Sequence, residues 1–369
     1  MKVEQQSTGR RFGVGKQILF SVIIVATFLL LAEGAVRVYA LGFRTSYERY
    51  NPTAGRLELV PNLRHTNARG EEFRINSRGF VGPEFDQQPP DGVVRIIAVG
   101  DSCTFSEGFW RYAYPSILER YLNASAGRKR FEVINAGIEG YNSTFARARI
   151  EQELIGYRPH LVLLYVGWND LMKTDPRNAQ AVGQYAALAS LMEQSYLVRA
   201  YRKVMFVYLR PLLFQPRVGV DTESRVYDEF VPGVYRDNLQ SIVETLRRHQ
   251  IQSVLVTRPT VVRPDMTRDE LDKQHVFFPY FAGSYSVGEF LGLHRAYNQV
   301  VWAVGERSAT PVVDLDAAFE QHDKSRLFWD TMHPSRRGHC LVAGELYRRL
   351  APGFGLTGEV PGDDEAICR

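Results

Sequence analysis

Cysteine is scarce in this chain, and its pattern matches no metal site. The 369 residues contain three cysteines, an odd number with neither metal-ligand spacing nor an evident disulfide framework: Cys103, Cys340 and Cys368. The eight histidines form no HExxH motif or other paired ligand pattern. The sequence therefore indicates no metal, and none of its motifs requires a cofactor.

Excess charge is also missing from most of the chain. The formal net charge is +4, but residues 1–16 alone carry +3, which leaves +1 for the rest. That excess comes from four basic residues against Glu4: Lys2, Arg10, Arg11 and Lys16. The body of the protein therefore gives no reason to expect a nucleic acid partner.

A long uncharged run near the N-terminus stands out from the globular composition of the rest. Residues 18–32 carry no charge, a length that is long for a signal peptide and short for a full membrane span. Extension to Val38 reaches a spanning length and places Glu33 and Arg37 one helical turn apart, where they can pair.

This run predicts a membrane anchor. No small-residue cleavage site is obvious, although Val38-Tyr39-Ala40 resembles one. We therefore expect an uncleaved signal anchor over residues 17–38. Because residues 1–16 are basic, they should stay in the cytoplasm, and the remaining chain should face the periplasm or the exterior.

The clearest strand signal is followed directly by a candidate nucleophile. The apolar, β-branched run over residues 93–99 is typical of a central parallel strand covered on both faces. Gly100 permits a tight turn, and Asp101 and Ser102 follow it. Ligands of open parallel sheets bind at the carboxyl ends of the strands, so Ser102 is a candidate nucleophile. Gly-Asp-Ser is also an ordinary turn tripeptide.

Three later stretches add further candidates. The run VINAG ends at Gly137, and the run LVLLYVGWND ends at Asn169 and Asp170. Near the C-terminus, WDTMHP places Asp330 three residues before His333. Singly, each has an ordinary explanation as a turn glycine, a helix cap or a surface pair. Together, and in this order, they indicate one site.

These blocks resemble those of the SGNH (GDSL-type) hydrolases. The four marker residues of that family fall, in order, at Ser102, Gly137, Asn169 and His333. The chain departs from the family at the fourth letter of the GDSL signature, which is Cys103 here. That position carries no catalytic role in the family, so the departure concerns the subfamily and not the chemistry. The resemblance covers roughly residues 93–350.

The resemblance implies a role for each residue. A serine hydroxyl is a weak nucleophile, so Ser102 needs His333 as general base, and Asp330 would orient the imidazole and stabilise its charged form. The oxyanion donors would be the backbone N–H groups of Ser102 and Gly137 and the side-chain amide of Asn169. Four neighbours would support this site: Gly100, Asp101, Gly167 and Asp170.

Strand and helix signals alternate along the domain, which predicts a parallel sheet with helices on both faces. We expect strands at residues 93–99, 131–135, 161–166, 253–257 and 311–315. We expect helices at residues 114–122, 144–154, 234–248, 290–307 and 336–350. The resemblance implies a flavodoxin-like three-layer α/β/α sandwich with a five-stranded parallel sheet, preceded by one transmembrane helix.

The predicted order of parts follows from these signals. Several prolines argue against long helices in residues 39–92. We expect this segment to form a tether that packs on the domain edge. Within it, residues 73–84 resemble the leader of membrane-anchored family members. The parts are a basic N-terminus (1–16), an anchor (17–38), the tether (39–92), the hydrolase domain (93–351) and a tail (352–369).

Residues 171–230 look like an insertion in the hydrolase domain. Within them, residues 196–214 place Leu197, Tyr201, Val204 and Tyr208 on one helical face, with basic residues elsewhere. Two interpretations remain open. The segment is either a helical cap that completes the core, or a lid or membrane-surface patch that admits an acyl or lipid substrate.

The sequence thus predicts a membrane-anchored serine esterase that acts through an acyl-serine intermediate. Its expected substrate is an acetyl or other short O-acyl ester of a small molecule, glycan or lipid outside the cytoplasm. One alternative is an acyltransferase that passes the acyl group to a cell-surface glycan with the same residues. Another is a catalytically silent glycan-binding or scaffold protein, which would have no need of the full set of residues.

Overall fold

A computed structural model of the protein describes residues 14–42, 47–51, 53–66, 70–128, 130–173, 195–205, 217–219, 224–279 and 284–361. The chain divides into two compact units. The first comprises Met1–Ser46 and Tyr185–Gln215, and the second comprises Tyr47–Gln184 and Pro216–Arg369. The candidate site residues all belong to the second unit.

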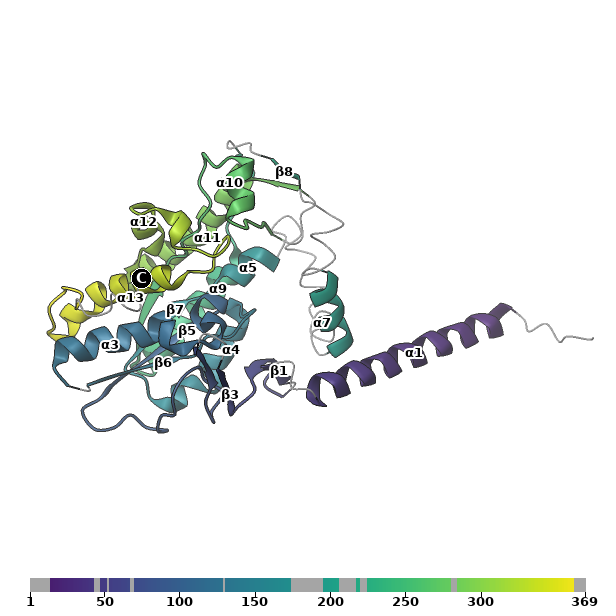
Figure 1. Ribbon diagram of the computed structural model, residues 1–369, viewed down its shortest axis with the longest axis horizontal. Coiled ribbons are helices and arrows are strands. Elements are labelled where there is room, and N and C mark those ends of the chain that lie inside the picture. The colour runs from purple at the N-terminus through teal and green to yellow at the C-terminus, as the bar shows by residue number, and fades with distance from the viewer. Residues whose placement is uncertain are drawn as a thin grey trace, which may run out of the picture. The chain divides into compact units, whose positions relative to one another are not determined.

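The second unit is built on a five-stranded parallel sheet (Figure 1). The strand order is β11-β9-β7-β5-β6, so the chain starts at β5, adds the edge strand β6 on one side of it, and then adds β7, β9 and β11 in turn on the other side. The strands are β5 (Val94–Gly100), β6 (Phe131–Asn135), β7 (Leu161–Tyr165), β9 (Gln252–Val256) and β11 (Val312–Val313). Every residue of β7 is buried, as expected for an apolar strand covered on both faces. The predicted fold class is confirmed.

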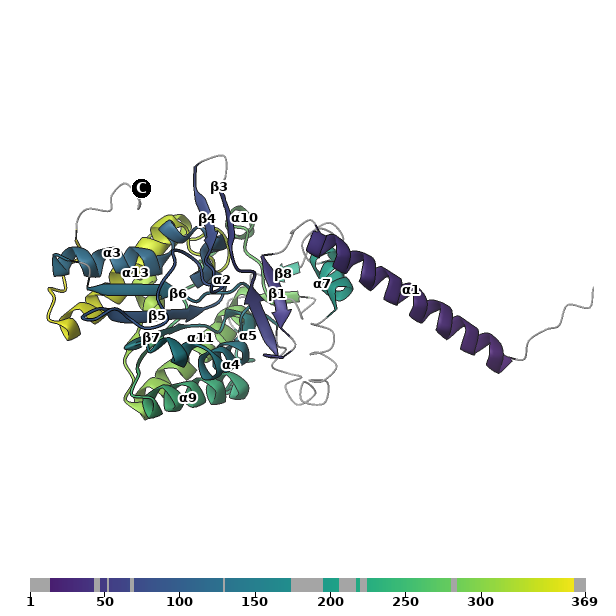
Figure 2. The same ribbon diagram turned by 90° about the horizontal axis from the view of Figure 1, so that it is seen from below.

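Helices cover both faces of this sheet, which makes three layers (Figure 2). One face carries α3 (Tyr114–Ala126) and α13 (Arg336–Leu350), which pack on each other. The other face carries α4 (Ser143–Gln152), α9 (Gly233–Arg248) and α11 (Val287–Ser308).

The predicted boundaries are wrong where side chains cap a helix. Strand β11 ends at Val313 and not near residue 315, because the Asp314 side chain caps α12 (Leu315–Glu320) by accepting from the N–H of Ala317. Helix α11 begins three residues earlier than predicted, at Val287, because Ser286 and Glu289 form a capping box.

Within the predicted tether, four short strands pair as two antiparallel ladders. The first pairs β1 (Glu48–Asn51) with β2 (Arg56–Leu59), and the second pairs β3 (Leu63–Thr66) with β4 (Glu72–Ile75). The N–H of Val81 then donates to the carbonyl of Asn135 on edge strand β6, at 3.2 Å. The leader therefore covers part of an edge that would otherwise expose unpaired backbone groups.

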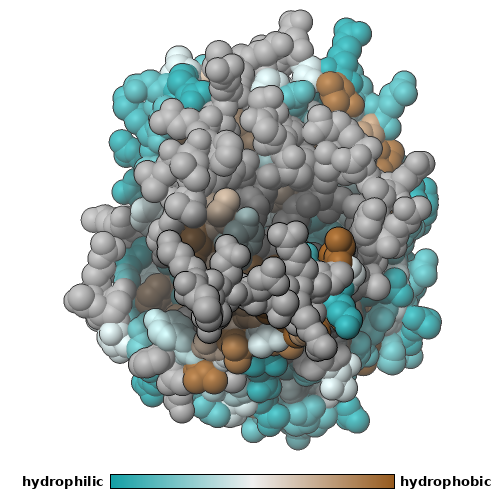
Figure 3. Space-filling view, turned by 90° about the vertical axis from the view of Figure 1, so that its right-hand side faces the viewer, coloured by the Kyte–Doolittle hydropathy of each residue, from teal (hydrophilic) through white to brown (hydrophobic). Residues whose placement is uncertain are grey.

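Short elements complete the second unit. Strand β8 (Arg217–Gly219) pairs in parallel with β10 (Ser284–Ser286). The short α-helices are α2 (Ser102–Phe105), α5 (Trp168–Lys173) and α10 (Arg268–Lys273). Single 3-10 turns span Ser106–Gly108, Trp110–Tyr112, Leu154–Tyr157, Lys324–Arg326 and Ala351–Phe354. In the space-filling view, the described residues around the rim of one face are mostly hydrophilic (Figure 3).

The first unit consists, where it is described, of α1 (Val14–Gly42) and α7 (Tyr196–Lys203). Residues Val14–Tyr39 are long and apolar enough to cross a membrane, although a signal sequence has the same properties. Glu33 of α1 pairs with Arg37 at 2.9 Å, and its carboxylate accepts the N–H groups of Tyr196 and Leu197 at 3.0 and 2.8 Å. Helix α7, which belongs to the predicted insertion, thus packs on the apolar helix α1. Tyr208, which was predicted to share its apolar face, lies outside the described residues.

Candidate active site

The turn after β5 presents Ser102 at the carboxyl edge of the sheet. Gly100 ends the strand, and a side chain there would overlap the Thr104 side chain and the Tyr165 carbonyl. Asp101 then caps α2 by accepting the N–H of Cys103 at 3.0 Å. As a result, Ser102 is the first residue of a short helix that starts at the end of a central strand.

The loop before α13 brings His333 and Asp330 to Ser102. His333 Nε2 lies 2.8 Å from Ser102 Oγ, and His333 Nδ1 lies 2.7 Å from Asp330 Oδ2. A carboxylate only accepts, so Nδ1 carries the proton and Nε2 accepts from the serine hydroxyl. Asp330 Oδ1 also accepts the backbone N–H groups of Met332 and His333, both at 3.0 Å, which fixes its orientation.

This contact shifts the pKa values of both partners. Burial alone lowers the pKa of His333, but the hydrogen bond and charge of Asp330 outweigh it and hold that pKa above its ordinary value. Burial likewise raises the pKa of Asp330, but the hydrogen bond and charge of His333 and two backbone N–H groups bring it below its usual range. The pair therefore favours an ionised aspartate beside an imidazole that takes up a proton readily.

The Gly137 turn lies against the nucleophile helix. A side chain at residue 137 would overlap the backbone of Thr104 and Phe105 in α2, so glycine permits this close approach. The N–H of Gly137 donates to Asn135 Oδ1 at 2.9 Å, and Asn135 Nδ2 donates to the Thr104 carbonyl at 2.8 Å. The predicted oxyanion donor at Gly137 is therefore already hydrogen-bonded within the protein.

The Asn169 turn follows β7. Asn169 Nδ2 donates one N–H to the Tyr141 carbonyl at 3.0 Å, and an amide nitrogen has a second N–H to offer. Gly167, at φ +133°, precedes it in a conformation that favours glycine. Asp170 accepts from the backbone N–H and the hydroxyl of Ser143, at 2.8 and 2.5 Å, which ties α5 to α4.

Two of the predicted supporting residues are buried carboxylates, Asp101 next to the serine and Asp170 next to Asn169. Burial raises the pKa of Asp101 to about 6, although the Cys103 N–H and the positive charges of His333 and Arg258 act in the opposite direction. Its Oδ2 atom has no hydrogen-bond partner among the described residues. Burial also raises the pKa of Asp170, partly offset by Ser143 and Arg258.

All nine predicted site residues lie along the carboxyl edge of the sheet or in the loop before α13. The structure brings Ser102, Asp330 and His333 into direct contact. Sequence reasoning missed three polar residues that hold the surrounding turns, Asn135, Tyr141 and Arg258. The signal for Asn135 was present, because it ends strand β6 two residues before Gly137.

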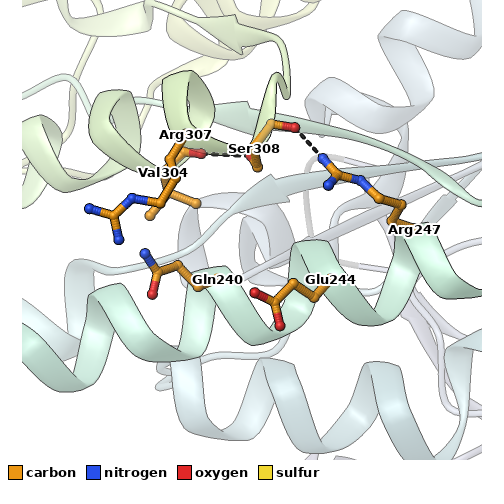
Figure 4. Close-up of a pocket in the computed structure, with 6 residues that line it drawn as sticks. All are labelled: Gln240, Glu244, Arg247, Val304, Arg307 and Ser308. Atoms are coloured by element: carbon orange, nitrogen blue, oxygen red, sulfur yellow. Dashed lines mark hydrogen bonds between the residues drawn. The ribbon is translucent and has the colours of Figure 1, made fainter.

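The second unit also has a surface pocket, shown in close-up in Figure 4. It is lined by Gln240, Glu244, Arg247, Val304, Arg307 and Ser308, from the C-terminal halves of α9 and α11. Those helix ends lead into the strands β9 and β11, so the pocket lies at the amino edge of the sheet. It contains none of the predicted site residues.

A three-layer α/β/α fold with a Ser–His–Asp contact at the carboxyl edge of its sheet is the arrangement of a hydrolase. Residues 98–341, well over half of the chain, match the GDSL-like lipase/acylhydrolase family. The chain belongs to this family, and the protein is a carboxylic ester hydrolase.

Individual relatives are distant. The uncharacterized lipoprotein YqeF of Bacillus subtilis (strain 168) is 23% identical over 229 residues, which cover 60% of this chain and 71% of that protein. The lipase/acylhydrolase from Enterococcus faecalis is 16% identical, with a TM-score of 0.44 over 73% of this chain and 100% of that one. The acetyl xylan esterase AlAXEase is also 16% identical, with a TM-score of 0.42 over 70% of this chain and 100% of that one.

Proposed function

We propose that this ester hydrolase is a serine esterase with Ser102 as nucleophile, His333 as general base and Asp330 as the residue that orients it. The observation that carries the proposal is the 2.8 Å contact between Ser102 Oγ and His333 Nε2, with Nδ1 held by Asp330 at 2.7 Å. This is the geometry that activates a serine hydroxyl, because the base is within hydrogen-bond reach and its tautomer is fixed.

The reaction proceeds in two halves. His333 Nε2 takes the proton of Ser102 as Oγ attacks the ester carbonyl carbon, and the tetrahedral intermediate collapses to an acyl-serine. The alcohol leaves with the proton returned by His333. Water then gives a proton to His333, attacks the acyl-serine, and releases the carboxylic acid and free Ser102. No metal or cofactor takes part in these steps.

The oxyanion is stabilised by the backbone N–H of Ser102 and by the side-chain amide of Asn169 in this proposal. Asn169 has one N–H left for the substrate after its bond to Tyr141. The N–H of Gly137 joins them only by sharing or exchanging its bond to Asn135. In this proposal Asn135 competes with the substrate for the N–H of Gly137.

Release of the alcohol before the acid tests the acyl-serine step. Full-length protein in detergent mixed with p-nitrophenyl acetate should release a burst of p-nitrophenol close to the enzyme concentration, followed by slower steady turnover. Ser102→Ala should show neither phase. Equal product release by wild type and Ser102→Ala would refute the proposal.

The pH dependence should report His333. We expect kcat/KM for p-nitrophenyl acetate to fall as the pH drops through the pKa of His333, because only the neutral imidazole accepts the serine proton. Asp330 raises that pKa, so the midpoint of the acid limb should lie above 6.5, the ordinary histidine value. Ser102→Ala supplies the background rate at each pH. A midpoint below 6.5 would contradict the role given to Asp330.

We further propose that the substrate is an acetyl or other short O-acyl ester outside the cytoplasm, with residues 17–38 as an uncleaved anchor, 39–92 as a leader and 93–351 as the hydrolase domain. The apolar helix Val14–Tyr39, behind a basic N-terminus, supports the orientation. The name of the Bacillus subtilis relative, a lipoprotein, is in keeping with attachment to a membrane.

Cysteine chemistry gives independent support for this location. Cys340 on α13 is disulfide-bonded, which the spacing of the cysteines in the sequence did not indicate, whereas Cys103 is a free buried thiol. Disulfides persist mainly in oxidising compartments such as the periplasm. Cys340 therefore favours an extracytoplasmic domain.

Thiol counting tests this assignment without knowledge of the substrate. Denatured protein from cells should react with one equivalent of maleimide before reduction and three after it, since one disulfide leaves one of the three cysteines free. The Cys103→Ala variant should react with none before reduction. Three reactive thiols in freshly denatured, unreduced protein would indicate a reducing compartment and contradict the proposed topology.

A further inference from the structure

Two buried arginines hold the carbonyl groups that precede the two candidate oxyanion turns. Arg149 Nη1 donates to the carbonyl of Ala136, directly before Gly137, at 2.9 Å. Arg258 Nη1 donates to the carbonyl of Val166, directly before Gly167, also at 2.9 Å. Both arginines are buried, and Arg258 is fully so.

The two arginines differ in how their charge is balanced. Arg149 forms an ion pair with Glu153 at 3.2 Å. The other partners of Arg258 are neutral, namely the Tyr235 hydroxyl and Asn298 Oδ1 at 3.1 Å, and its Nε atom has no partner among the described residues. A buried charge that forms no direct ion pair among the described residues is costly to fold, so stability alone gives little reason to place it there.

The guanidinium of Arg258 lies directly against the Asn169 turn. A side chain at Gly167 would overlap this guanidinium and the ring of Tyr235. The Tyr235 hydroxyl also donates to the Val166 carbonyl, at 2.9 Å, so two donors converge on one backbone oxygen. The turn is therefore held at the carbonyl of Val166, three residues before Asn169 and just before the chain enters α5.

The charge of Arg258 also acts on two buried carboxylates, one beside Ser102 and one beside Asn169. It lowers the pKa of Asp101, which directly precedes Ser102, and the pKa of Asp170, which directly follows Asn169, in both cases against the larger effect of burial. A fixed, buried positive charge also favours the negative charge that develops on the substrate oxygen.

We propose that Arg258 is a positioning residue for the active site, which fixes the Val166–Gly167 turn so that Asn169 meets the oxyanion. This inference rests on the proposed function. Arg258 does not touch the substrate, and it acts through the turn and through its buried charge. A displacement of about 1 Å in such a turn costs on the order of 10² in rate.

The test compares Arg258→Met and Arg258→Lys with a matched control in full-length protein. Arg95 is also fully buried and donates to the backbone carbonyls of Gln87 and Tyr157, but it lies at the start of β5, at the opposite edge of the sheet. With p-nitrophenyl acetate, Arg258→Met should lose on the order of 10² in kcat with KM nearly unchanged. Arg258→Lys should recover part of that loss, because lysine keeps the positive charge but lacks the planar guanidinium with its several N–H donors. Arg95→Met should keep kcat at temperatures where it stays folded.

Three results would overturn the inference. They are a kcat of Arg258→Met within about twofold of wild type, a loss that appears in KM instead of kcat, and an equal kcat loss in folded Arg95→Met. If Arg258→Met does not fold, Tyr235→Phe removes one donor to the Val166 carbonyl and keeps the charge. It should lower kcat roughly tenfold, and an unchanged kcat would count against the turn mechanism.

Failure of this inference is distinguishable from failure of the proposed function. If wild type exceeds Ser102→Ala in turnover while Arg258→Met equals wild type, only the role of Arg258 is lost. If wild type neither turns over the ester nor reacts with a fluorophosphonate, the assigned site is wrong and the role of Arg258 falls with it.

Discussion

Replacement of Ser102 or His333 by alanine should lower turnover by about 10⁴- to 10⁶-fold. The two side chains act as one unit, since the 2.8 Å contact between them is what makes the hydroxyl nucleophilic. Loss of either should therefore cost about as much as loss of both. Steady-state hydrolysis of p-nitrophenyl acetate by the two single variants and the double variant measures this.

Ser116→Ala on α3 and His322→Ala, at an exposed position, are the matched controls, and both should keep full activity. Thermal unfolding should give similar midpoints for all variants, because Ser102 and His333 are only partly buried. A Ser102→Ala or His333→Ala protein that retains a tenth of wild-type turnover would remove the assignment. A loss of turnover in the double variant equal to the product of the two single losses would also contradict the assignment.

Asp330→Asn should lower kcat by about 10⁴-fold and leave the fold intact. The asparagine carbonyl oxygen can still accept the backbone N–H groups of Met332 and His333, so the loop keeps its shape. Its amide donates to Nδ1, however, and this forces the imidazole proton onto Nε2. The histidine then has no lone pair to accept the proton of Ser102.

Asp265→Asn is the control, because Asp265 is an exposed aspartate with a surface ion pair to Arg263 at 3.3 Å. It should change kcat little. If Asp330→Asn keeps activity within about tenfold of wild type, His333 does not depend on Asp330 for its tautomer. The base would then have to be oriented by another group.

The sheet and its polar edge could be predicted from the sequence because both leave local signals. Each central strand is a short run of apolar, often β-branched residues, and burial on both faces allows no polar alternation. The turn that follows each strand lies at a common edge, so Ser102 and Asn169 could be placed near each other before any contact was known. The hydrogen bonds that these two residues form could not be predicted from the sequence.

Contacts made by tertiary packing left no such signal. The hydrogen bond from the Gly137 N–H to Asn135 depends on how the chain turns after β6. The contact of Arg258 with Gly167 depends on the pairing of strands β7 and β9, which the two residues follow. An arginine after a strand looks the same in sequence whether it is buried or solvated. Only the structure shows that Arg258 is fully buried.

The N-terminal unit illustrates the same limit. The spacing of Glu33 and Arg37 predicted their ion pair, which the structure shows at 2.9 Å. It did not predict that Glu33 would accept the first N–H groups of α7, more than 160 residues later in the chain. Helix ends leave such N–H groups unpaired, and a carboxylate from a distant segment can satisfy them.

The measurement that tests the central claim most directly is labelling of the full-length protein with a fluorophosphonate, followed by intact mass analysis. The probe reports an activated serine without any assumption about the ester. Our account predicts one adduct on wild type, none on Ser102→Ala, and sharply slowed labelling of His333→Ala. A folded wild type that stays unlabelled, or an adduct that persists in Ser102→Ala, would contradict the assignment of Ser102 as the nucleophile.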